Sequence, residues 1–454
     1  MSPRKKRRLP RPTEPGNGYR NERSGAARRA LVFHPYARSP QPRGEAKPGR
    51  GPAARLAEGE ALAAAIGLRV VGSEAIRMAR FRAGGLLGRG KIDEIAITVD
   101  DSDVDLVIID AGLTPIQQRT LERRWQCKVI DRTGLILEIF GARARTSEGK
   151  LQVELAALSY QRSRLVRSWT HLERQRGGFG FLGGPGESQL ETDRRQIDGR
   201  IRKLNKDLGT VKRTRALHRS GRARVPYPVV ALVGYTNAGK STLFNHLTAS
   251  RVVAEDMLFA TLDPTMRGLR LPSGRNIILS DTVGFVSELP TTLIAAFQAT
   301  LEEVIEADLI VHVRDIAHPE SETQQADVMA VLGEIMPEDA TTMSPLEALN
   351  KLDLVDQEAR VRLLNGCARR ESEVAVSALS GEGCPTLLER IDKRLAAREE
   401  MVDVKVALEN GAEIAWLYAH GEVIARTDDE TFATLRVTIS AANHGRFKRR
   451  AQVG

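Results

Sequence analysis

The sequence predicts an α/β protein with several parts: a small parallel α/β domain, a long antiparallel helical hairpin, a central α/β domain and a small C-terminal α/β appendage. Three observations support this prediction. Strand-like and helix-like patterns alternate from residue 53 to 145. Apolar residues recur about every 3.5 residues between Leu190 and Val211, as in paired helices. A β-branched run at 229–233 leads into a glycine-bounded loop and another helical pattern.

Length and composition set broad limits. The 454 residues exceed one ordinary core, so about three domains are expected, and 41% hydrophobic residues suffice to fold them. The net charge of +10 favours a polyanionic partner, nucleic acid before membrane; a merely soluble basic protein is the alternative. Three isolated cysteines argue against a disulfide framework or a zinc site and fit a reducing cytoplasm.

Targeting signals are not apparent. No apolar run approaches the roughly 20 residues that span a bilayer, and the basic N-terminus lacks the apolar segment of a signal peptide. We therefore expect a cytoplasmic monomer with at most peripheral membrane association.

Residues 1–52 are rich in Arg, Lys, Pro and Gly and are expected to form a disordered basic tail. The cluster Arg4–Arg8 leaves RNA contact or a nuclear signal open. An N-terminal α/β domain should follow at 53–145, with a strand at Leu106–Ile109 that is buried on both faces. Thr114 and Pro115 read as N-cap and first residue of a helix. The glycine loop at 84–90 lacks a Lys-Ser ending and reads as an ordinary turn.

The helical hairpin is predicted for residues 146–222, with helices at about 147–175 and 189–219. The second helix carries many cations with few compensating acids, which favours contact with RNA phosphates over a solvated coiled-coil face. These cations are Arg194, Arg195, Arg200, Arg202, Lys203, Lys206, Lys212, Arg213 and Arg215. The glycine-rich tip at 176–187 holds Phe179 and Phe181, which would either stack on unpaired bases or pack back on the hairpin.

The segment at 229–247 has the pattern strand, Gly-bounded loop ending in Gly-Lys-Ser, and helix, which is a P-loop. Its backbone N–H groups and the helix N-terminus would cradle phosphates. Lys240 would reach the β- and γ-phosphates, and the Ser241 hydroxyl would bind Mg²⁺. The predicted nucleotide-binding residues of this loop are Gly234, Tyr235, Thr236, Asn237, Ala238, Gly239, Lys240, Ser241 and Thr242.

Two switch-like segments follow the P-loop. In the first, Thr261 would close over the γ-phosphate and give Mg²⁺ a second oxygen. The second is a strand ending in Asp-x-x-Gly, where Asp281 would hold the magnesium shell through water and the Gly284 N–H would sense the γ-phosphate. Lys240, Thr261 and Gly284 are thus the predicted catalytic residues. The predicted nucleotide-binding residues here are Phe259, Ala260, Thr261, Leu262, Asp263, Asp281, Thr282, Val283 and Gly284.

Two later segments would read the base. The Asp353 carboxylate can accept hydrogen bonds from the guanine N1–H and 2-amino groups, which adenine does not offer as a pair, so such a site can discriminate by about 10⁴-fold. Backbone N–H groups after Val376 can meet guanine O6. The predicted residues are Asn350, Lys351, Leu352, Asp353, Ser377, Ala378 and Leu379. All five elements occur in the expected order, so residues 226–397 are predicted to be a P-loop GTPase domain that binds GTP and GDP, and residues 400–454 a small β-rich or α/β appendage.

The chain resembles the HflX family of ribosome-associated translational GTPases over about residues 55–450. The segments that carry the resemblance are Asp131–Leu137, Glu148–Leu155, Gly184–Glu187, Phe259–Thr265 and Asp281–Phe285. The resemblance implies a factor that enters the ribosome, contacts the large subunit and its rRNA, separates stalled particles under stress, and points its hairpin tip at the peptidyl transferase centre. The tip is more apolar than the family pattern, and the first 50 residues lie outside the match.

Hydrolysis should be slow without help, because Phe285 occupies the place where many GTPases have a glutamine that orients the attacking water. Asn237 resembles the asparagine that coordinates K⁺ in related GTPases, so K⁺ is a candidate cofactor beside Mg²⁺, and ribosomes should stimulate turnover. A second function stays open: a nucleotide-regulated RNA-binding or RNA-remodelling protein whose hydrolysis is incidental and whose N-terminal domain binds a second nucleotide.

Overall fold

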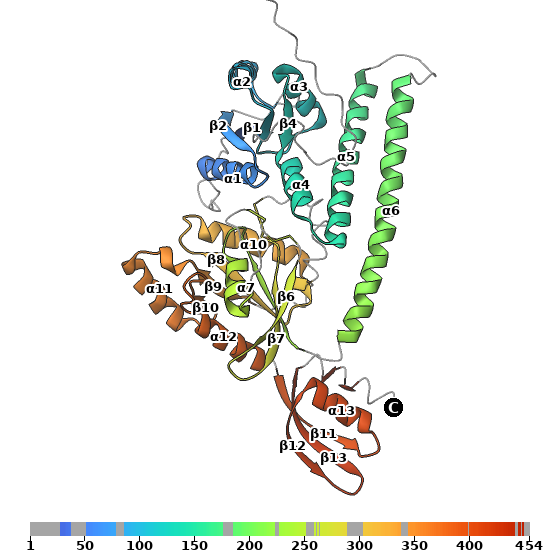
Figure 1. The fold of residues 1–454 in the computed structure, drawn as a ribbon, viewed down its shortest axis with the longest axis vertical. Helices are drawn as coiled ribbons and strands as arrows, with labels where there is room; N and C mark the ends of the chain where they lie inside the picture. Colours follow the sequence, from blue (N-terminus) through green and yellow to red (C-terminus); the bar gives the residue numbers. More distant parts are fainter. Residues whose placement is uncertain are drawn as a thin grey trace, which may run out of the picture.

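The computed structural model of the 454-residue chain describes residues 28–37, 51–78, 86–175, 185–222, 227–250, 258–259, 261–262, 264–287, 303–336, 344–397, 399–440, 444–445 and 447–448. For 166–175, 185–190, 212, 215–222, 399, 422 and 440 it describes the backbone alone. Three sheet-containing domains follow one another along the molecule, and a helical hairpin lies beside them (Figure 1). This matches the predicted α/β class and order of parts.

The N-terminal domain is a four-stranded parallel sheet of order β2-β1-β3-β4 with four helices. Along the chain its elements are β1 (Arg29–Ala37), α1 (Pro52–Ala64), β2 (Arg69–Met78), α2 (Arg89–Asp101), β3 (Leu106–Ile109), α3 (Pro115–Trp125), β4 (Lys128–Asp131) and α4 (Arg132–Arg143). All four residues of β3 are buried, as predicted. Thr114 caps α3 in a reciprocal capping box with Gln117, and Pro115 is the first helical residue, as predicted.

The interpretation of residues 1–52 as a disordered tail is wrong for residues 29–37. These residues form β1, an inner strand that pairs with both β2 and β3. Its residues Ala30–Phe33 are buried. Four apolar residues suffice for a strand that is covered on both faces. The composition of residues 1–52 did not reveal this strand, because basic residues, Pro and Gly dominate the average over the segment. The rest of the predicted tail, 1–27 and 38–50, lies outside the described residues.

The hairpin consists of α5 (Ser147–Gln175) and α6 (Pro185–Arg222), which run side by side (Figure 1). Leu158, Leu204 and Leu208 are buried in its seam, as the periodicity predicted. The tip at 176–184, with Phe179 and Phe181, lies outside the described residues.

The central domain is a six-stranded sheet of order β10-β9-β8-β5-β7-β6, parallel except for β6. Its elements are β5 (Val229–Gly234), α7 (Lys240–Thr248), β6 (Thr265–Arg270), β7 (Asn276–Asp281), β8 (Leu309–Asp315), α10 (Ser321–Ile335), β9 (Leu346–Asn350), η3 (Leu352–Leu354), α11 (Gln357–Arg369), β10 (Glu373–Ala375) and α12 (Cys384–Ala396).

The C-terminal part is an antiparallel sheet, β11-β13-β12, with one helix packed on it. It contains β11 (Glu399–Ala407), α13 (Gly411–His420), β12 (Glu422–Asp428) and β13 (Phe432–Ser440). The predicted small α/β appendage is therefore present. Among the described residues, none of the helices has both the length and the apolar character needed to cross a membrane.

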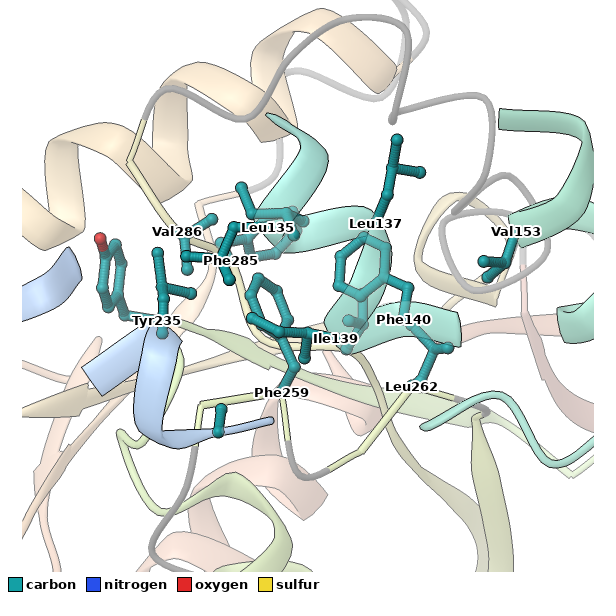
Figure 2. Packing of buried hydrophobic residues seen from close by; sticks show 14 of the residues in the cluster. Leu135, Leu137, Ile139, Phe140, Val153, Tyr235, Phe259, Leu262, Phe285 and Val286 are labelled. Carbon is teal, nitrogen blue, oxygen red and sulfur yellow. The ribbon is translucent and has the colours of Figure 1, made fainter. Parts of the chain in front are cut away.

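One apolar core joins the N-terminal and central domains. Leu135, Ile139 and Phe140 of α4 share it with Phe259 and Phe285 of the central domain (Figure 2). The rings of Phe140 and Phe259 meet edge to face, with centroids 4.8 Å apart. Edge-to-face aromatic pairs contribute about 0.5–1.5 kcal/mol beyond the area they bury. The two domains are thus packed as one body around segments that flank the predicted nucleotide site.

Candidate nucleotide-binding site

The P-loop is built by close approaches that only glycine permits. Gly234 ends β5 at φ 152°, and a Cβ there would lie 2.2 Å from the Val313 carbonyl oxygen. Gly239 has φ 89°, and a Cβ there would lie 2.2 Å from the Asn350 side-chain nitrogen. Helix α7 begins directly afterwards at Lys240. The predicted order of strand, loop and helix is confirmed, and its helix N-terminus faces the loop.

The side chain of Lys240, the first residue of α7, reaches back into this loop. Its Nζ donates hydrogen bonds to the carbonyl oxygens of Gly234 (3.2 Å) and Tyr235 (2.8 Å). Burial lowers the pKa of Lys240 to about 8, although the nearby charge of Asp281 opposes this. An arriving phosphate would favour the charged form of the ammonium, so the site is electrostatically matched to a polyanion.

Three oxygen-bearing side chains meet beside Lys240. The Ser241 hydroxyl lies 2.8 Å from the Thr261 hydroxyl and donates to Asp281 Oδ2 at 2.7 Å, and Thr261 donates to the same oxygen at 3.1 Å. Asp281 is fully buried, and its Oδ1 has no hydrogen-bond partner in the part of the chain that the structure describes. Burial raises the pKa of its carboxyl, against the hydrogen bond from Ser241 and the charge of Lys240. A compact set of hard oxygens with an unsatisfied buried carboxylate fits Mg²⁺.

Gly284 lies against the P-loop. A Cβ on Gly284 would lie 2.8 Å from the Thr236 Cα and 3.0 Å from Lys240 Nζ. The next residue, Phe285, is tied to the loop on both sides: its N–H donates to the Gly234 carbonyl (3.1 Å), and its carbonyl accepts from the Thr236 N–H (2.8 Å). Thr282 is buried and donates to the Leu232 carbonyl at 2.6 Å. The Asp-x-x-Gly segment therefore reaches the same place as Lys240, as predicted.

Asn350 links the P-loop to the loop expected to read the base. It is 1% exposed; its Nδ2 donates to the Ala238 carbonyl at 2.8 Å, and its Oδ1 accepts from the Ala378 N–H at 2.9 Å. Asp353 is exposed and accepts a hydrogen bond from Ser377 Oγ at 2.5 Å. Lys351 pairs with Asp315 at 2.7 Å. The carboxylate that would bind guanine is thus oriented by a neighbouring hydroxyl and left open to solvent.

Some predicted site residues have side chains that point elsewhere. Tyr235, Phe259 and Leu262 place their side chains in the core between the domains (Figure 2). Val283 belongs to the same core. Leu352 is buried below the base loop, and Leu379 is 78% exposed. Ala260 and Asp263 lie outside the described residues. Thr242 follows Ser241 in the first turn of α7, and Asn237 has φ 61°.

Motif reasoning missed the residues of the N-terminal domain that contact the candidate site. Ser287, just after the Asp-x-x-Gly segment, contacts Glu58 and Arg132 of that domain. No pattern in the sequence joins positions so far apart. The family-specific segment Asp131–Leu137 contains Arg132, and this was the one available signal.

Four family models match successive parts of the chain. They are described as GTP-binding GTPase N-terminal (residues 53–141), GTP-binding GTPase Middle Region (143–222), 50S ribosome-binding GTPase (229–351) and HflX C-terminal domain (362–454).

Individual relatives cover most of the chain. GTPase HflX of Magnetococcus marinus is 48% identical over 387 residues, which are 85% of this chain and 88% of that protein. GTPase HflX of Escherichia coli is 48% identical over 68% of this chain and 72% of that protein. Among solved structures, the complex of SsGBP with GDP matches with a TM-score of 0.46 and 23% identity, covering 82% of this chain and 99% of that one. On the extent of these sequence matches and the P-loop site, the chain belongs to the HflX family of GTPases.

Proposed function

We propose that this GTPase binds the large ribosomal subunit and its rRNA, and that its GTP-bound form dissociates or rescues stalled ribosomes under stress. The observation that carries the proposal is a row of exposed cations along α6, attached to a domain that matches a model described as a 50S ribosome-binding GTPase. Such a factor would work as a monomer in the cytoplasm.

For the nucleotide site we infer the following roles. Lys240 and the Gly284 N–H would contact the γ-phosphate, and Asp353 would select guanine. Ser241 and Thr261 would hold Mg²⁺, with Asp281 behind them, and when bound the ion supplies positive charge beside the β- and γ-phosphates.

Turnover by the isolated protein should be slow. Phe285 cannot orient a water by hydrogen bonding, so stimulation would come from the ribosome and from K⁺ held near Asn237.

The α6 cations differ in how they are engaged. Arg195 pairs with Glu191 and Arg200 pairs with Glu154, each at 2.7 Å, so these two serve the hairpin itself. Five further exposed cations form no ion pair with another described residue: Arg194, Arg202, Lys203, Lys206 and Arg213. These are the ones available to rRNA phosphates. Each phosphate contact releases counterions and steepens the salt dependence of binding.

The experiment is co-sedimentation with large subunits in a non-hydrolysable GTP analogue at several salt concentrations. Changing Arg194, Arg202 and Lys203 together to glutamine should weaken binding and flatten the slope of log affinity against log salt by about two to three. A matched control removes the same charge from helix α3 through Arg119→Gln, Arg123→Gln and Arg124→Gln, which are also exposed. An unchanged slope in the α6 variant, or an equal change in the control, contradicts the proposal.

Intact ribosomes distinguish the two candidate functions. Adding the GTP-bound protein to 70S particles should increase free subunits in a sedimentation profile. Binding without dissociation would instead favour the RNA-binding or RNA-remodelling alternative, for which the α6 cations alone would suffice.

A further inference from the structure

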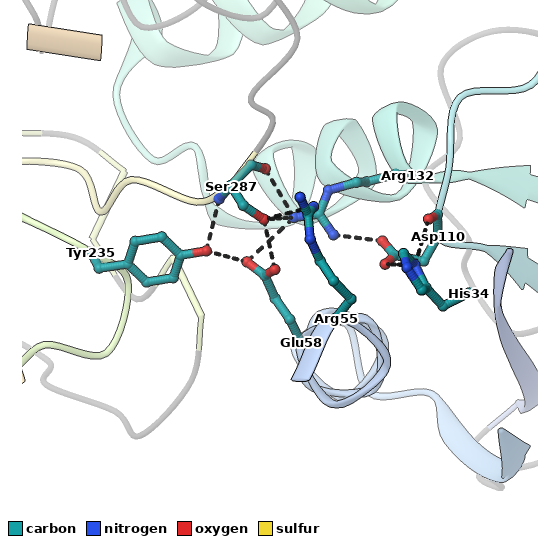
Figure 3. Close-up of polar contacts among 7 residues, drawn as sticks. All are labelled: His34, Arg55, Glu58, Asp110, Arg132, Tyr235 and Ser287. Carbon is teal, nitrogen blue, oxygen red and sulfur yellow. Dashed lines mark hydrogen bonds and ion pairs between the residues drawn. The ribbon is translucent and has the colours of Figure 1, made fainter. Parts of the chain in front are cut away.

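Ser287, three residues after Gly284, forms hydrogen bonds with residues of the N-terminal domain (Figure 3). It is 2% exposed. Its hydroxyl donates to Glu58 Oε2 at 2.8 Å and accepts from Arg132 Nη2 at 3.1 Å, and its carbonyl accepts from the same Nη2 at 3.0 Å. Its N–H donates to the Tyr235 hydroxyl at 2.7 Å, and that hydroxyl donates to Glu58 Oε1 at 2.5 Å. The end of the Asp-x-x-Gly segment and the P-loop are therefore held by the same carboxylate.

Two arginines reach Ser287: Arg55 Nη1 donates to its hydroxyl at 3.2 Å, and Arg132 is the one that also contacts its carbonyl (Figure 3). Arg132 is 4% exposed and pairs with Asp110 at 2.5 Å and Glu58 at 3.3 Å. Burial alone would lower the pKa of Arg132, but the charges of Asp110 and Glu58 outweigh it and raise the pKa. Asp110 also accepts from His34 at 3.0 Å, and its pKa is lowered by His34 and Arg132 against the effect of burial. The cluster is therefore charged, and Arg132 Nε is its one buried nitrogen without a hydrogen-bond partner among the described residues.

Arg132 is the first residue of α4. It follows Asp131, whose carboxylate caps α4 by accepting from the Gly134 N–H at 2.8 Å. Asp131 also accepts from the Leu113 N–H at 3.2 Å and contacts the hairpin: Tyr160 donates to it at 2.5 Å, and Arg164 forms an ion pair with it. Adjacent residues at one strand end thus hold the hairpin and the central domain. This gives a physical role to the start of the Asp131–Leu137 segment.

The other switch-like segment is docked on the same helix. Phe259, two residues before Thr261, packs edge to face on Phe140 of α4. Thr261 meets Ser241, and Gly284 lies against Lys240. The segments of Thr261 and Gly284 therefore both lie beside the P-loop, where phosphates are expected to bind, and both also contact the N-terminal domain.

We propose that Arg132 is a positioning residue for GTP hydrolysis: through Ser287 it holds Gly284 beside Lys240, where the Gly284 N–H can stabilise the transferring phosphoryl group. Arg132 acts from another domain and does not itself touch the nucleotide. The proposal rests on the GTPase activity and is independent of what the hairpin binds.

The expected effect follows from geometry. A donor aimed at developing charge is effective only when it is placed within a few tenths of an ångström, and a displacement of about 1 Å can cost about 100-fold in rate. Releasing Ser287 frees the chain only three residues from Gly284. It leaves the P-loop glycines, Ser241 and Asp353 untouched, so GDP affinity should be preserved while hydrolysis slows.

The test uses Arg132→Lys and Ser287→Ala in the full chain. Lysine keeps the buried charge beside Asp110 and Glu58, so the fold is spared, but one ammonium cannot span both the carboxylate and Ser287 as the guanidinium does. Ser287→Ala removes the hydroxyl from the other side of the contact. The control is Arg143→Lys, the same chemical change at the far end of α4, where Arg143 donates to the Ala65 carbonyl.

Single-turnover hydrolysis and GDP affinity are measured for each variant, with thermal unfolding to show that it folds. We expect Arg132→Lys and Ser287→Ala each to lower the hydrolysis rate about tenfold or more, with GDP affinity within about twofold, and the double variant to be no slower than the slower single one. Arg143→Lys should match the parent. An unchanged or faster rate in both variants, or a rate loss that follows an equal loss of GDP affinity, overturns the proposal.

Discussion

Asp353→Asn tests the guanine site most directly. Its carboxylate would accept from the guanine N1–H and 2-amino groups, and hydrogen bonds to a charged group contribute about 1.5–3 kcal/mol each. Losing both would cost about 3–6 kcal/mol, or roughly 10²–10⁴-fold in GTP affinity. The asparagine amide instead offers a donor to the 2-oxo group of xanthine. Because Asp353 is exposed and accepts from the Ser377 hydroxyl, which can also donate to an amide oxygen, the fold should be unaffected.

Competition binding of GTP against xanthosine triphosphate measures this exchange. The matched control is Asp356→Asn, three residues along the same segment. Asp356 caps α11 by accepting from the Ala359 N–H at 2.9 Å, and asparagine caps as well as aspartate. The control loses the same charge but should keep its preference for GTP. If Asp353→Asn also prefers GTP, or if both variants lose GTP affinity equally, the assignment of Asp353 is refuted.

Three further predictions concern the ions and the fold. Thr261→Ala should spare GDP binding and weaken Mg²⁺-dependent binding of GTP, measured by titration with each nucleotide; equal losses would make Thr261 structural. K⁺ should stimulate hydrolysis over Na⁺, and Asn237→Ala should abolish the difference. Glu347 is partly buried, which favours a raised pKa, but its interactions with His312 and Arg314 outweigh this and lower its pKa to about 2 from 4.5. Its stabilisation is therefore present above pH 4.5 and lost as pH falls, so between pH 5 and 3 the parent should lose about 2 kcal/mol more stability than Glu347→Gln in urea unfolding.

Local signals in the sequence predicted local structure well. The P-loop, the Thr114 cap and the buried strand at Leu106–Ile109 were all recoverable, because the residues that decide each of them lie within one turn or one strand. The strand at 29–37 was missed because its apolar core is short and sits in a basic stretch. Its burial depends on pairing with a strand some seventy residues later, between Ala30 and Leu106.

The interface between domains was beyond such reasoning for the same reason. Ser287 and Glu58 are 229 positions apart, and each looks like an ordinary surface residue in its own segment. Only the folded chain shows that a serine hydroxyl, a glutamate and an arginine satisfy one another away from water. The specific segment at Asp131–Leu137 marked the place without indicating what it contacts.

Phe285 shows how a local motif and the contact between domains are related. Seen as a motif position, it lacks the polar group that would orient an attacking water. In the fold it is 3% exposed within the core shared by the two domains, while its backbone bridges the P-loop. A glutamine there would bring an amide into apolar surroundings, at a cost of about 1–3 kcal/mol without a partner. The Phe285 side chain therefore packs the segment against the N-terminal domain and does not orient water. The same packing that positions Gly284 leaves no side chain at this position to orient the attacking water.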